Sequence, residues 1–337
     1  MPRSIDRSLA ARKRRLTLVA QWLLAAVVIG FAARELAQQW EGISPTLAGV
    51  RVEWARIVAS GALVLSTYLL LIEAWRSTLR AWGQSIAFPE AARIWFVSNL
   101  GKYIPGRVWQ IAAMGAMAKR SGVSATAAIG SSLVVNLVSI IAGFAVIAAT
   151  AGGRIADVVG LDTAGGGSHR SELAVVGIAI VGAAALALAP FAIPRLVALA
   201  ARATGRAITV PRVPPRAIWI ATASTVASWL LYGVAFAWFA RGVTPRATGN
   251  AWSYIAVYTG SYLAGYLALF VPGGVGVREA VLVLAMPRFQ LASATDAAVI
   301  AITSRLWLTV LEILPGLLLL RRRGGVETRD ANHTDDS

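Results

Sequence analysis

Long apolar runs alternate with short basic or Gly-rich segments along the chain. Six runs reach the length of about 20 apolar residues with which a helix crosses a hydrocarbon layer of about 30 Å. They cover residues 16–36, 54–75, 124–150, 172–194, 216–240 and 296–320. Two more, 91–119 and 251–286, are interrupted near their middles by Pro and Gly. The pattern predicts an all-α polytopic membrane protein with six full transmembrane helices and two broken segments.

Composition supports the membrane class. Hydrophobic residues make up 57 % of the 337 positions and charged residues 14 %, which is too apolar for a soluble domain because one compact core stops growing near this length. The net charge of +16 would indicate nucleic acid in a soluble protein. Here the basic residues flank hydrophobic spans, as they do in cytoplasmic loops, so we expect no nucleic-acid partner.

Basic residues also predict the orientation. Six of the first 15 residues are Lys or Arg and the span after them has no cleavage site, so it reads as a retained helix with a cytoplasmic N-terminus. Segment 195–216 holds five arginines and no acid, and Arg321 to Arg323 follow the last span, which places both in the cytoplasm. We therefore divide the chain into a cytoplasmic N-terminus (1–15), an inner (plasma) membrane domain (16–320) and a polar cytoplasmic tail (321–337).

These loop assignments constrain the two broken segments. Each full crossing changes the side of the membrane, so 91–119 must enter and leave on the cytoplasmic side and 251–286 on the outer side. Both would then be re-entrant hairpins. One hairpin from each side is typical of inverted-topology repeats. In the alternative, 251–271 is a full crossing and the C-terminus lies outside.

The two breaks share one pattern. Aromatic, β-branched, Pro, Gly, any residue, Val occurs at 103–108 and again, 167 residues later, at 270–275. A single Pro-Gly would indicate only a kink, but discontinuous helices at corresponding positions of two halves mark a midplane binding site. A half-helix that starts after such a break directs unpaired N–H groups and its positive dipole end into that space, where an anion can bind.

Charged residues adjoin both breaks. Lys102 and Arg107 flank the first, and Arg278 and Glu279 follow the second. Because an ionisable residue at membrane depth normally faces a polar interior, we expect Lys102, Arg107 and Arg278 to hold an anionic head group. Glu279 would be a counter-charge or a proton-coupled partner. In the structural alternative, Arg278 and Glu279 only form structural ion pairs with other charges. Lys102 and Arg107 would then snorkel to the cytoplasmic interface.

Two further sets lie within the spans. Arg305 and Glu312 are two turns apart on one face of the last helix, so we expect both to face inward, lining a cavity or clamping the helix to the hairpins. Tyrosines recur every four residues at 254, 258, 262 and 266, as a packing stripe or as a groove for an acyl chain.

Signals for an enzyme are weak. His169 and His333 are the only histidines and both lie in polar segments, and cysteine is absent. Neither histidine-based catalysis nor a His- or Cys-built metal site is therefore supported. We expect no cofactor, no metal and no enzymatic activity.

Two segments carry a resemblance to a known family. SNLGKYIPGRVWQ (98–110) and FVPGGVGVREA (270–280) resemble the signature regions of the flippase-like family, which comprises the lysylphosphatidylglycerol synthase transmembrane region and its stand-alone relatives. The second segment matches the family's P-G-G-x-G-x-R-E run position by position, and the first matches more loosely. In synthase members a soluble aminoacyl-transfer domain follows, and this chain stops at Ser337 without one. The resemblance therefore implies a flippase rather than lipid aminoacylation.

The resemblance and the breaks together predict a function. We expect translocation of an anionic or amino-modified lipid, or of a lipid-linked glycan carrier, across the plasma membrane through a midplane site. The partners would be a membrane lipid with an anionic or phosphate-containing head group and a synthase or transferase. The alternatives are an enzyme or accessory subunit acting on a lipid-linked sugar or aminoacyl lipid, and a non-transporting partner that positions another protein. The candidate substrate-binding residues are Asn99, Lys102, Tyr103, Pro105, Gly106, Arg107, Pro272, Gly273, Gly274, Gly276, Arg278, Glu279, Arg305 and Glu312.

Overall fold

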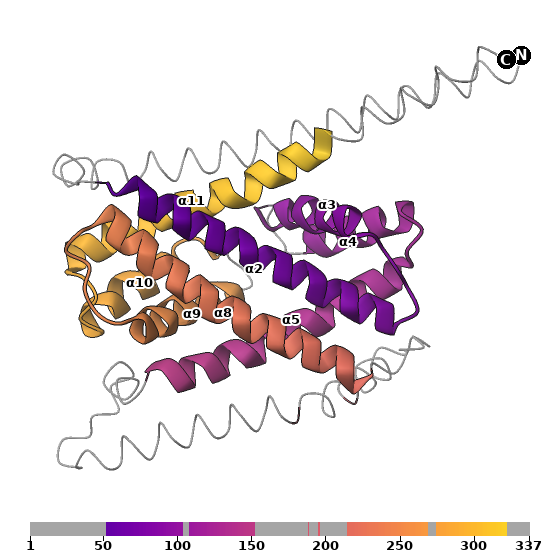
Figure 1. The fold of residues 1–337 in the computed structure, drawn as a ribbon, viewed down its shortest axis with the longest axis horizontal. Helices are drawn as coiled ribbons and strands as arrows, with labels where there is room; N and C mark the ends of the chain where they lie inside the picture. Colours follow the sequence, from indigo (N-terminus) through magenta and orange to yellow (C-terminus); the bar gives the residue numbers. More distant parts are fainter. Residues whose placement is uncertain are drawn as a thin grey trace, which may run out of the picture. The chain divides into compact units, whose positions relative to one another are not determined.

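Helices make up the described part of the chain, as predicted. The computed structural model describes residues 52–103, 108–151, 188, 195, 214–268 and 274–321, and the helices within these ranges, none accompanied by a strand, belong to the unit Val50–Ser337. They are α2 (Trp54–Ala81), α3 (Phe88–Asn99), the 3-10 helix η1 (Leu100–Tyr103), α4 (Val108–Arg120), α5 (Ala125–Ala151), α8 (Pro215–Val243), α9 (Ala251–Leu267), α10 (Val277–Arg288) and α11 (Ala294–Arg321) (Figure 1).

Four of these helices are long and apolar enough to cross a membrane: α2, α5, α8 and α11. They coincide with four of the six predicted spans. The predicted spans 16–36 and, apart from residue 188, 172–194 lie outside the described residues.

The local sequence explains where several helices begin. Pro215 opens α8, where its fixed φ suits the first turn and its missing N–H would have had no helical partner anyway. Asn250 caps α9, because its side-chain oxygen accepts a hydrogen bond from the N–H of Ser253 at 2.9 Å. Ser293 does the same for α11 by accepting from the N–H of Asp296 at 3.1 Å.

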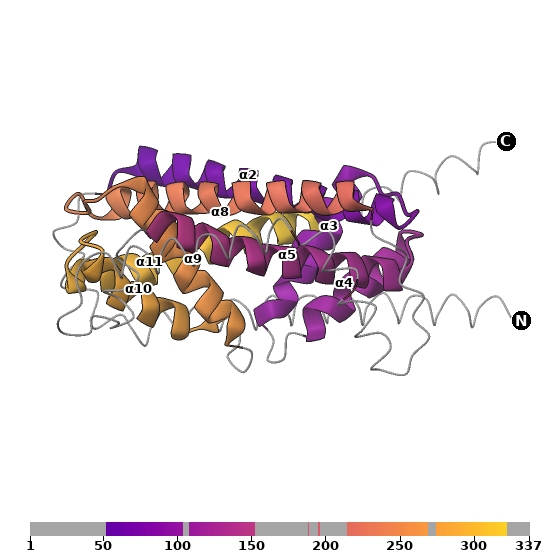
Figure 2. The same ribbon diagram turned by 90° about the horizontal axis from the view of Figure 1, so that it is seen from below.

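Helices α2 and α8 run side by side in opposite directions (Figures 1 and 2). Where α2 begins, the N–H of Glu53 donates to the carbonyl of Gly242, near the end of α8, at 2.8 Å. Where α2 ends, Ala74 shares a buried cluster with Ala217 and Ile218, from the first turn of α8. The pair thus has two ends, which we call the Ala81 end and the Val243 end.

The first broken segment folds back on itself at the Ala81 end. Its helices α3 and α4 have 12 and 13 residues, or about 18 and 20 Å at 1.5 Å per residue, so each is too short to cross the hydrocarbon. The start of α3 meets the end of α4. There the hydroxyl of Ser121 donates to the carboxylate of Glu90, and the N–H of Ser124 donates to Gln84 Oε1 at 3.0 Å. The segment is therefore a helical hairpin.

The second broken segment forms a hairpin at the Val243 end. Helices α9 and α10 have 17 and 12 residues. Their outer ends meet where Thr248, just before α9, donates from its N–H to the carbonyl of Leu291 at 2.8 Å and from its hydroxyl to that of Gln290 at 2.9 Å. In Figure 1 the two hairpins lie toward opposite ends of the α2–α8 pair. In the structure α9 is thus one arm of a hairpin, and α10 returns to the end where α9 began.

Small residues let these helices approach closely. A Cβ on Gly143 of α5 would lie 2.8 Å from the side chain of Leu263 and 3.2 Å from that of Trp229. On the outside, large apolar side chains are exposed, among them Trp54 at 70 % and Val58 at 69 %. Close contacts through glycine and an apolar exterior are what a lipid environment favours, since lipid tails are as apolar as the side chains that face them.

Candidate functional site

A cavity of about 370 Å³ lies between the two hairpins and the long helices. Each of the elements α2, α3, η1, α4, α5, α8, α9, α10 and α11 contributes to its wall. The predicted site residues that line it are Asn99, Lys102, Arg278, Arg305 and Glu312. Residues from both breaks and from the last helix therefore meet at one place.

Helix α11 carries an ion pair to each hairpin. Glu312 Oε2 lies 2.5 Å from Lys102 Nζ, at the first break, and Glu312 Oε1 accepts a hydrogen bond from the hydroxyl of Tyr68 at 3.2 Å. Arg305 lies two turns before Glu312 on the same face of α11, and its Nη1 is 3.9 Å from Glu279 Oε1, at the second break. Arg305 and Glu312 thus both line the cavity and connect α11 to the hairpins, the two roles that the sequence offered as alternatives.

The first break is held closed by its own residues. The side-chain amide of Gln110 donates to Asn99 Oδ1 at 3.0 Å, which joins the end of α3 to the start of α4. Gly101 fits against the same turn, because a Cβ there would lie 2.8 Å from the backbone nitrogen of Gln110. These contacts hold η1 against α4 and place Lys102 at the cavity. The predicted site residues Pro105, Gly106 and Arg107, and the side chain of Tyr103, lie outside the described residues.

The second break depends on two glycines with left-handed backbone. Gly274 has φ +67° and Gly276 has φ +80°, a region that residues with a Cβ rarely adopt. Gly274 also lies against Gly265 of α9, where a Cβ would be 2.5 Å from the Gly265 carbonyl oxygen. The predicted residues Pro272 and Gly273 lie outside the described residues.

Glu279 caps the half-helix that follows this break. Its Oε2 accepts a hydrogen bond from the N–H of Gly276 at 2.7 Å, and a carboxylate in the first turn also offsets the positive end of the helix dipole. The sequence pattern predicted that the N–H groups at the start of this half-helix bind a ligand, but the N–H of Gly276 already donates to Glu279. Glu279 lies between this helix end and Arg305, as a counter-charge should.

Arg278 lies against α9. Its guanidinium lies over the rings of Tyr258 and Tyr262, with 5.0 and 5.3 Å from Cζ to the ring centroids, and the residue is only 5 % exposed. Among the described residues its Nη2 has no hydrogen-bond partner. Cation–π contacts contribute about 0.5–2 kcal/mol each, whereas burying an ion costs several kcal/mol. Arg278 is thus a buried cation that its own chain neutralises only in part.

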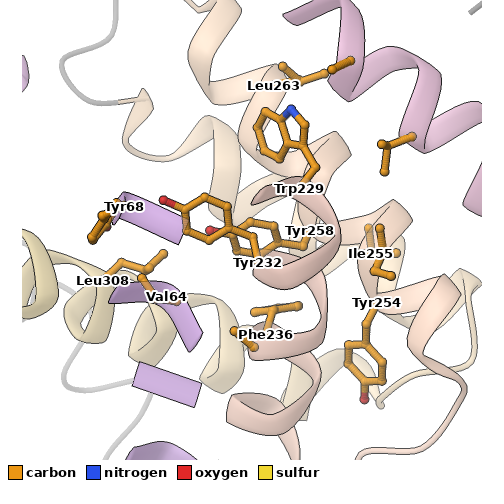
Figure 3. Close-up of a cluster of buried hydrophobic side chains, with 14 of the residues drawn as sticks. Val64, Tyr68, Trp229, Tyr232, Phe236, Tyr254, Ile255, Tyr258, Leu263 and Leu308 are labelled. Carbon is orange, nitrogen blue, oxygen red and sulfur yellow. The ribbon is translucent and has the colours of Figure 1, made fainter. Parts of the chain in front are cut away.

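An aromatic wall supports this cation. Tyr258 stacks on Tyr232 of α8 with ring centroids 5.6 Å apart and an interplanar angle of 19°, and Tyr68 of α2 lies 6.1 Å from Tyr232. Figure 3 shows the rings of Tyr232 and Tyr258 lying one over the other.

The tyrosine stripe of α9 has two different environments. Tyr254 and Tyr258 are 0 % and 1 % exposed and pack in the core, whereas Tyr262 and Tyr266 line the cavity. The stripe therefore packs in the core over its N-terminal half and forms a cavity wall over its C-terminal half.

Several lining residues were not singled out from the sequence. Ser132, Asn136 and Ser139 of α5 face the cavity, as does Ser228 of α8. The three on α5 follow the i, i+4, i+7 spacing of one helix face, so this polar stripe in an apolar helix was a readable signal. Gly101 carried no comparable signal, because its importance comes from a contact that only the folded turn creates.

The charge of the cavity indicates the kind of ligand it suits. Within the described ranges its charged lining residues are three cations and one carboxylate, and no group of three or more His, Cys, Asp or Glu residues could hold a metal ion. Arg side chains are well shaped for bidentate contact with phosphate. Within the described residues, the cavity therefore presents more positive than negative charge to a ligand.

Comparison with protein families gives one match, which spans most of the chain. The family model of the lysylphosphatidylglycerol synthase TM region matches residues 16–316. The chain belongs to this family. Both segments that resembled the family lie inside the matched range, so the predicted resemblance is confirmed. Comparison with curated proteins gives no match.

Membership in the lysylphosphatidylglycerol synthase TM region family defines the setting of the site. The protein is an integral membrane protein, and its function is related to membrane lipid. The cavity between the hairpins thus lies within the transmembrane region that defines the family.

Proposed function

We propose that the protein moves a lipid with a phosphate-containing head group between the two leaflets of the plasma membrane. The head group, anionic or amino-modified, or the phosphate of a lipid-linked glycan carrier, would pass through the cavity while the acyl chains stay in the bilayer. The observation that carries this proposal is the partly neutralised Arg278, buried in a cavity where both broken hairpins meet. Such charges inside a membrane domain normally mark a substrate pathway.

The proposal includes a topology. The hairpins α3–α4 and α9–α10 are re-entrant, the first from the cytoplasm and the second from outside, as an inverted repeat among six full crossings. The opposite positions of the hairpins along α2 and α8 support this arrangement, as do helices shorter than the hydrocarbon is thick. Both termini are then cytoplasmic.

Helix α11 is the connection between the two repeats in this mechanism. A phosphate that reaches the cavity competes with Glu312 for Lys102 and with Glu279 for Arg305. Each exchange loosens one hairpin from α11, and rocking of one repeat against the other would then open the cavity to one leaflet at a time. No covalent chemistry is involved. A lipid or ion gradient drives the movement, and a separate synthase or transferase supplies the lipid.

The direct test uses purified full-length protein in liposomes that contain a fluorescently labelled phospholipid. An impermeant reductant bleaches only outer-leaflet label, so a translocator raises the bleached fraction from the outer-leaflet share to nearly all of the label. Bleaching equal to that of protein-free liposomes, for anionic, amino-modified and glycan-linked lipids alike, would refute the proposal. Release of free sugar or amino acid from the lipid would instead indicate the enzymatic alternative.

Removing either charge next to the second break should slow this movement. We expect Arg278→Gln and Glu279→Gln to slow bleaching of inner-leaflet label by about tenfold to a hundredfold, the value of a hydrogen bond to a charged group. Glutamine at 279 keeps an oxygen that can accept from the Gly276 N–H, so the cap survives and only the charge is lost. Arg216→Gln, at the exposed start of α8, is the control and should behave as wild type. Wild-type rates in both test variants would exclude these two residues from the pathway.

A further inference from the structure

We infer that the preferred head group carries one negative charge and an uncharged, hydroxyl-bearing substituent, as in a phosphodiester of glycerol or of a sugar. This inference rests on the proposed function and identifies the class of lipid that the cavity selects. It follows from which charges in the cavity are already paired and which polar groups stand beside them.

The charged groups of the cavity come from three elements. Among the described lining residues, α2, α3, α4, α5, α8 and α9 contribute only uncharged side chains. Lys102 of η1 is paired with Glu312 of α11, and Arg305 of α11 lies near Glu279 of α10. Arg278 lies over the two tyrosine rings, and among the described residues Glu279 and Glu312 act on it only at longer range than an ion pair. The charges of these two pairs cancel, so the five described groups together carry one net positive charge, that of Arg278.

Arg278 also supplies the geometry for a phosphate. A guanidinium presents its N–H groups as a planar fork that matches two oxygens of a phosphate. The rings of Tyr258 and Tyr262 fix the plane of this fork, and the buried Nη2 has no hydrogen-bond partner within the part of the chain that the structure describes. A phosphodiester oxygen would provide both the missing acceptor and the missing charge.

The remaining polar lining suits hydroxyl groups. Ser132, Asn136, Ser139 and Ser228 present neutral hydroxyl and amide groups to the same cavity. The hydroxyl of Ser228 donates to the carbonyl of Ser224, and the amide of Asn136 donates to that of Ser132. The oxygens of these two side chains can still accept from the hydroxyls of glycerol or of a sugar. A cavity of about 370 Å³ has room for a head group of this size, not for its acyl chains.

The same charges disfavour two other head groups. An ammonium would enter a positive cavity whose lining carboxylate, Glu312, already holds Lys102. A pyrophosphate would bring a second negative charge, which the other described cations, Lys102 and Arg305, could balance only by leaving Glu312 and Glu279. Amino-modified and pyrophosphate-linked lipids should therefore bind more weakly than a singly charged phosphodiester.

The test measures how short-chain lipids raise the thermal unfolding midpoint of the full-length protein in detergent, since a ligand that binds only the folded state stabilises it by mass action. The probes are dioctanoyl phosphatidylglycerol, phosphatidylcholine, lysylphosphatidylglycerol and a polyprenyl pyrophosphate. We expect phosphatidylglycerol to act at the lowest concentration, about tenfold or more below the others. Arg278→Gln should weaken it about tenfold to a hundredfold, Arg278→Lys less, and Arg216→Gln not at all.

Tighter binding of the lysyl or pyrophosphate lipid, or unchanged phosphatidylglycerol binding in Arg278→Gln, would overturn the inference. If Arg278→Gln does not fold, the wild-type ranking alone decides. The liposome assay separates this inference from the proposed function. Selective phosphatidylglycerol binding without movement of any lipid supports the head-group class and refutes transport. Movement of lysylphosphatidylglycerol without binding of phosphatidylglycerol supports transport and refutes the class.

Discussion

Replacing Glu312 by Gln is expected to lower the free energy of unfolding by about 3–5 kcal/mol, the cost of removing one member of a buried ion pair. Lys102 Nζ lies 2.5 Å from this carboxylate, and the two side chains are 19 % and 9 % exposed. Glutamine can still accept from the Tyr68 hydroxyl, so the loss reports the charge pair rather than that hydrogen bond. Chemical denaturation of the purified protein in mixed micelles measures the change.

The companion experiment removes both charges. Lys102→Met with Glu312→Leu removes both ions of this pair, and replacing a whole buried pair by apolar residues is often close to neutral, so the double variant should recover most of the lost stability. In the proposed mechanism it should nevertheless fail to move lipid, because the exchangeable link between α11 and the first hairpin is gone. A stable and fully active double variant would show that the pair is structural only.

A surface pair provides the control for this cycle. Glu73 is paired with Arg76 and Arg80 near the end of α2, and its side chain is 40 % exposed. Exposed pairs contribute about 0–1 kcal/mol, so Glu73→Gln should change stability little. If Glu312→Gln costs no more than Glu73→Gln, then the cavity is wet enough to solvate Lys102, and the argument from burial fails.

The positions of the long helices and of the breaks could be predicted because each depends on local sequence. Apolar length predicted α2, α5, α8 and α11, and the Pro-Gly pattern predicted where both hairpins turn. The predicted end of α2 fell six residues early, at 75 instead of Ala81. Hydropathy follows the apolar stretch, whereas the helix continues through Arg76 and Arg80, whose charges pair with Glu73 within the same helix.

The pairing of charges could not be predicted, because it depends on how distant helices pack. Lys102 and Glu312 are both identifiable from sequence as embedded charges, yet nothing local indicates that they pair across the cavity. Likewise, Arg278 and Glu279 are adjacent in sequence but contact different helices, since consecutive helical side chains point about 100° apart. Only the packing of α9 and α11 against α10 places Glu279 near Arg305 and Arg278 over Tyr258 and Tyr262.

The second break provides the other large effect, in a comparison of two glycines. Gly274→Ala is expected to cost at least about 3 kcal/mol, because it combines a left-handed backbone with a new Cβ only 2.5 Å from the carbonyl oxygen of Gly265. Neither backbone can yield without separating the break from α9. Gly276→Ala has a similar φ of +80° but no atom within 4 Å of the new Cβ, so only the conformational strain of about 1–2 kcal/mol remains.

The difference between these two variants isolates the contact between α9 and the break. Gly83→Ala gives a reference outside the site, since Gly83 has φ +69° and an open environment just after α2; it should match Gly276→Ala. If Gly274→Ala also matched them in the free energy of unfolding, the turn would tolerate a shift away from Gly265, and the position of Arg278 over Tyr258 and Tyr262 would not depend on this contact. A selective loss in Gly274→Ala means that the close approach of two glycines holds the buried cation at the cavity, which explains why a glycine follows the Pro-Gly of the second break.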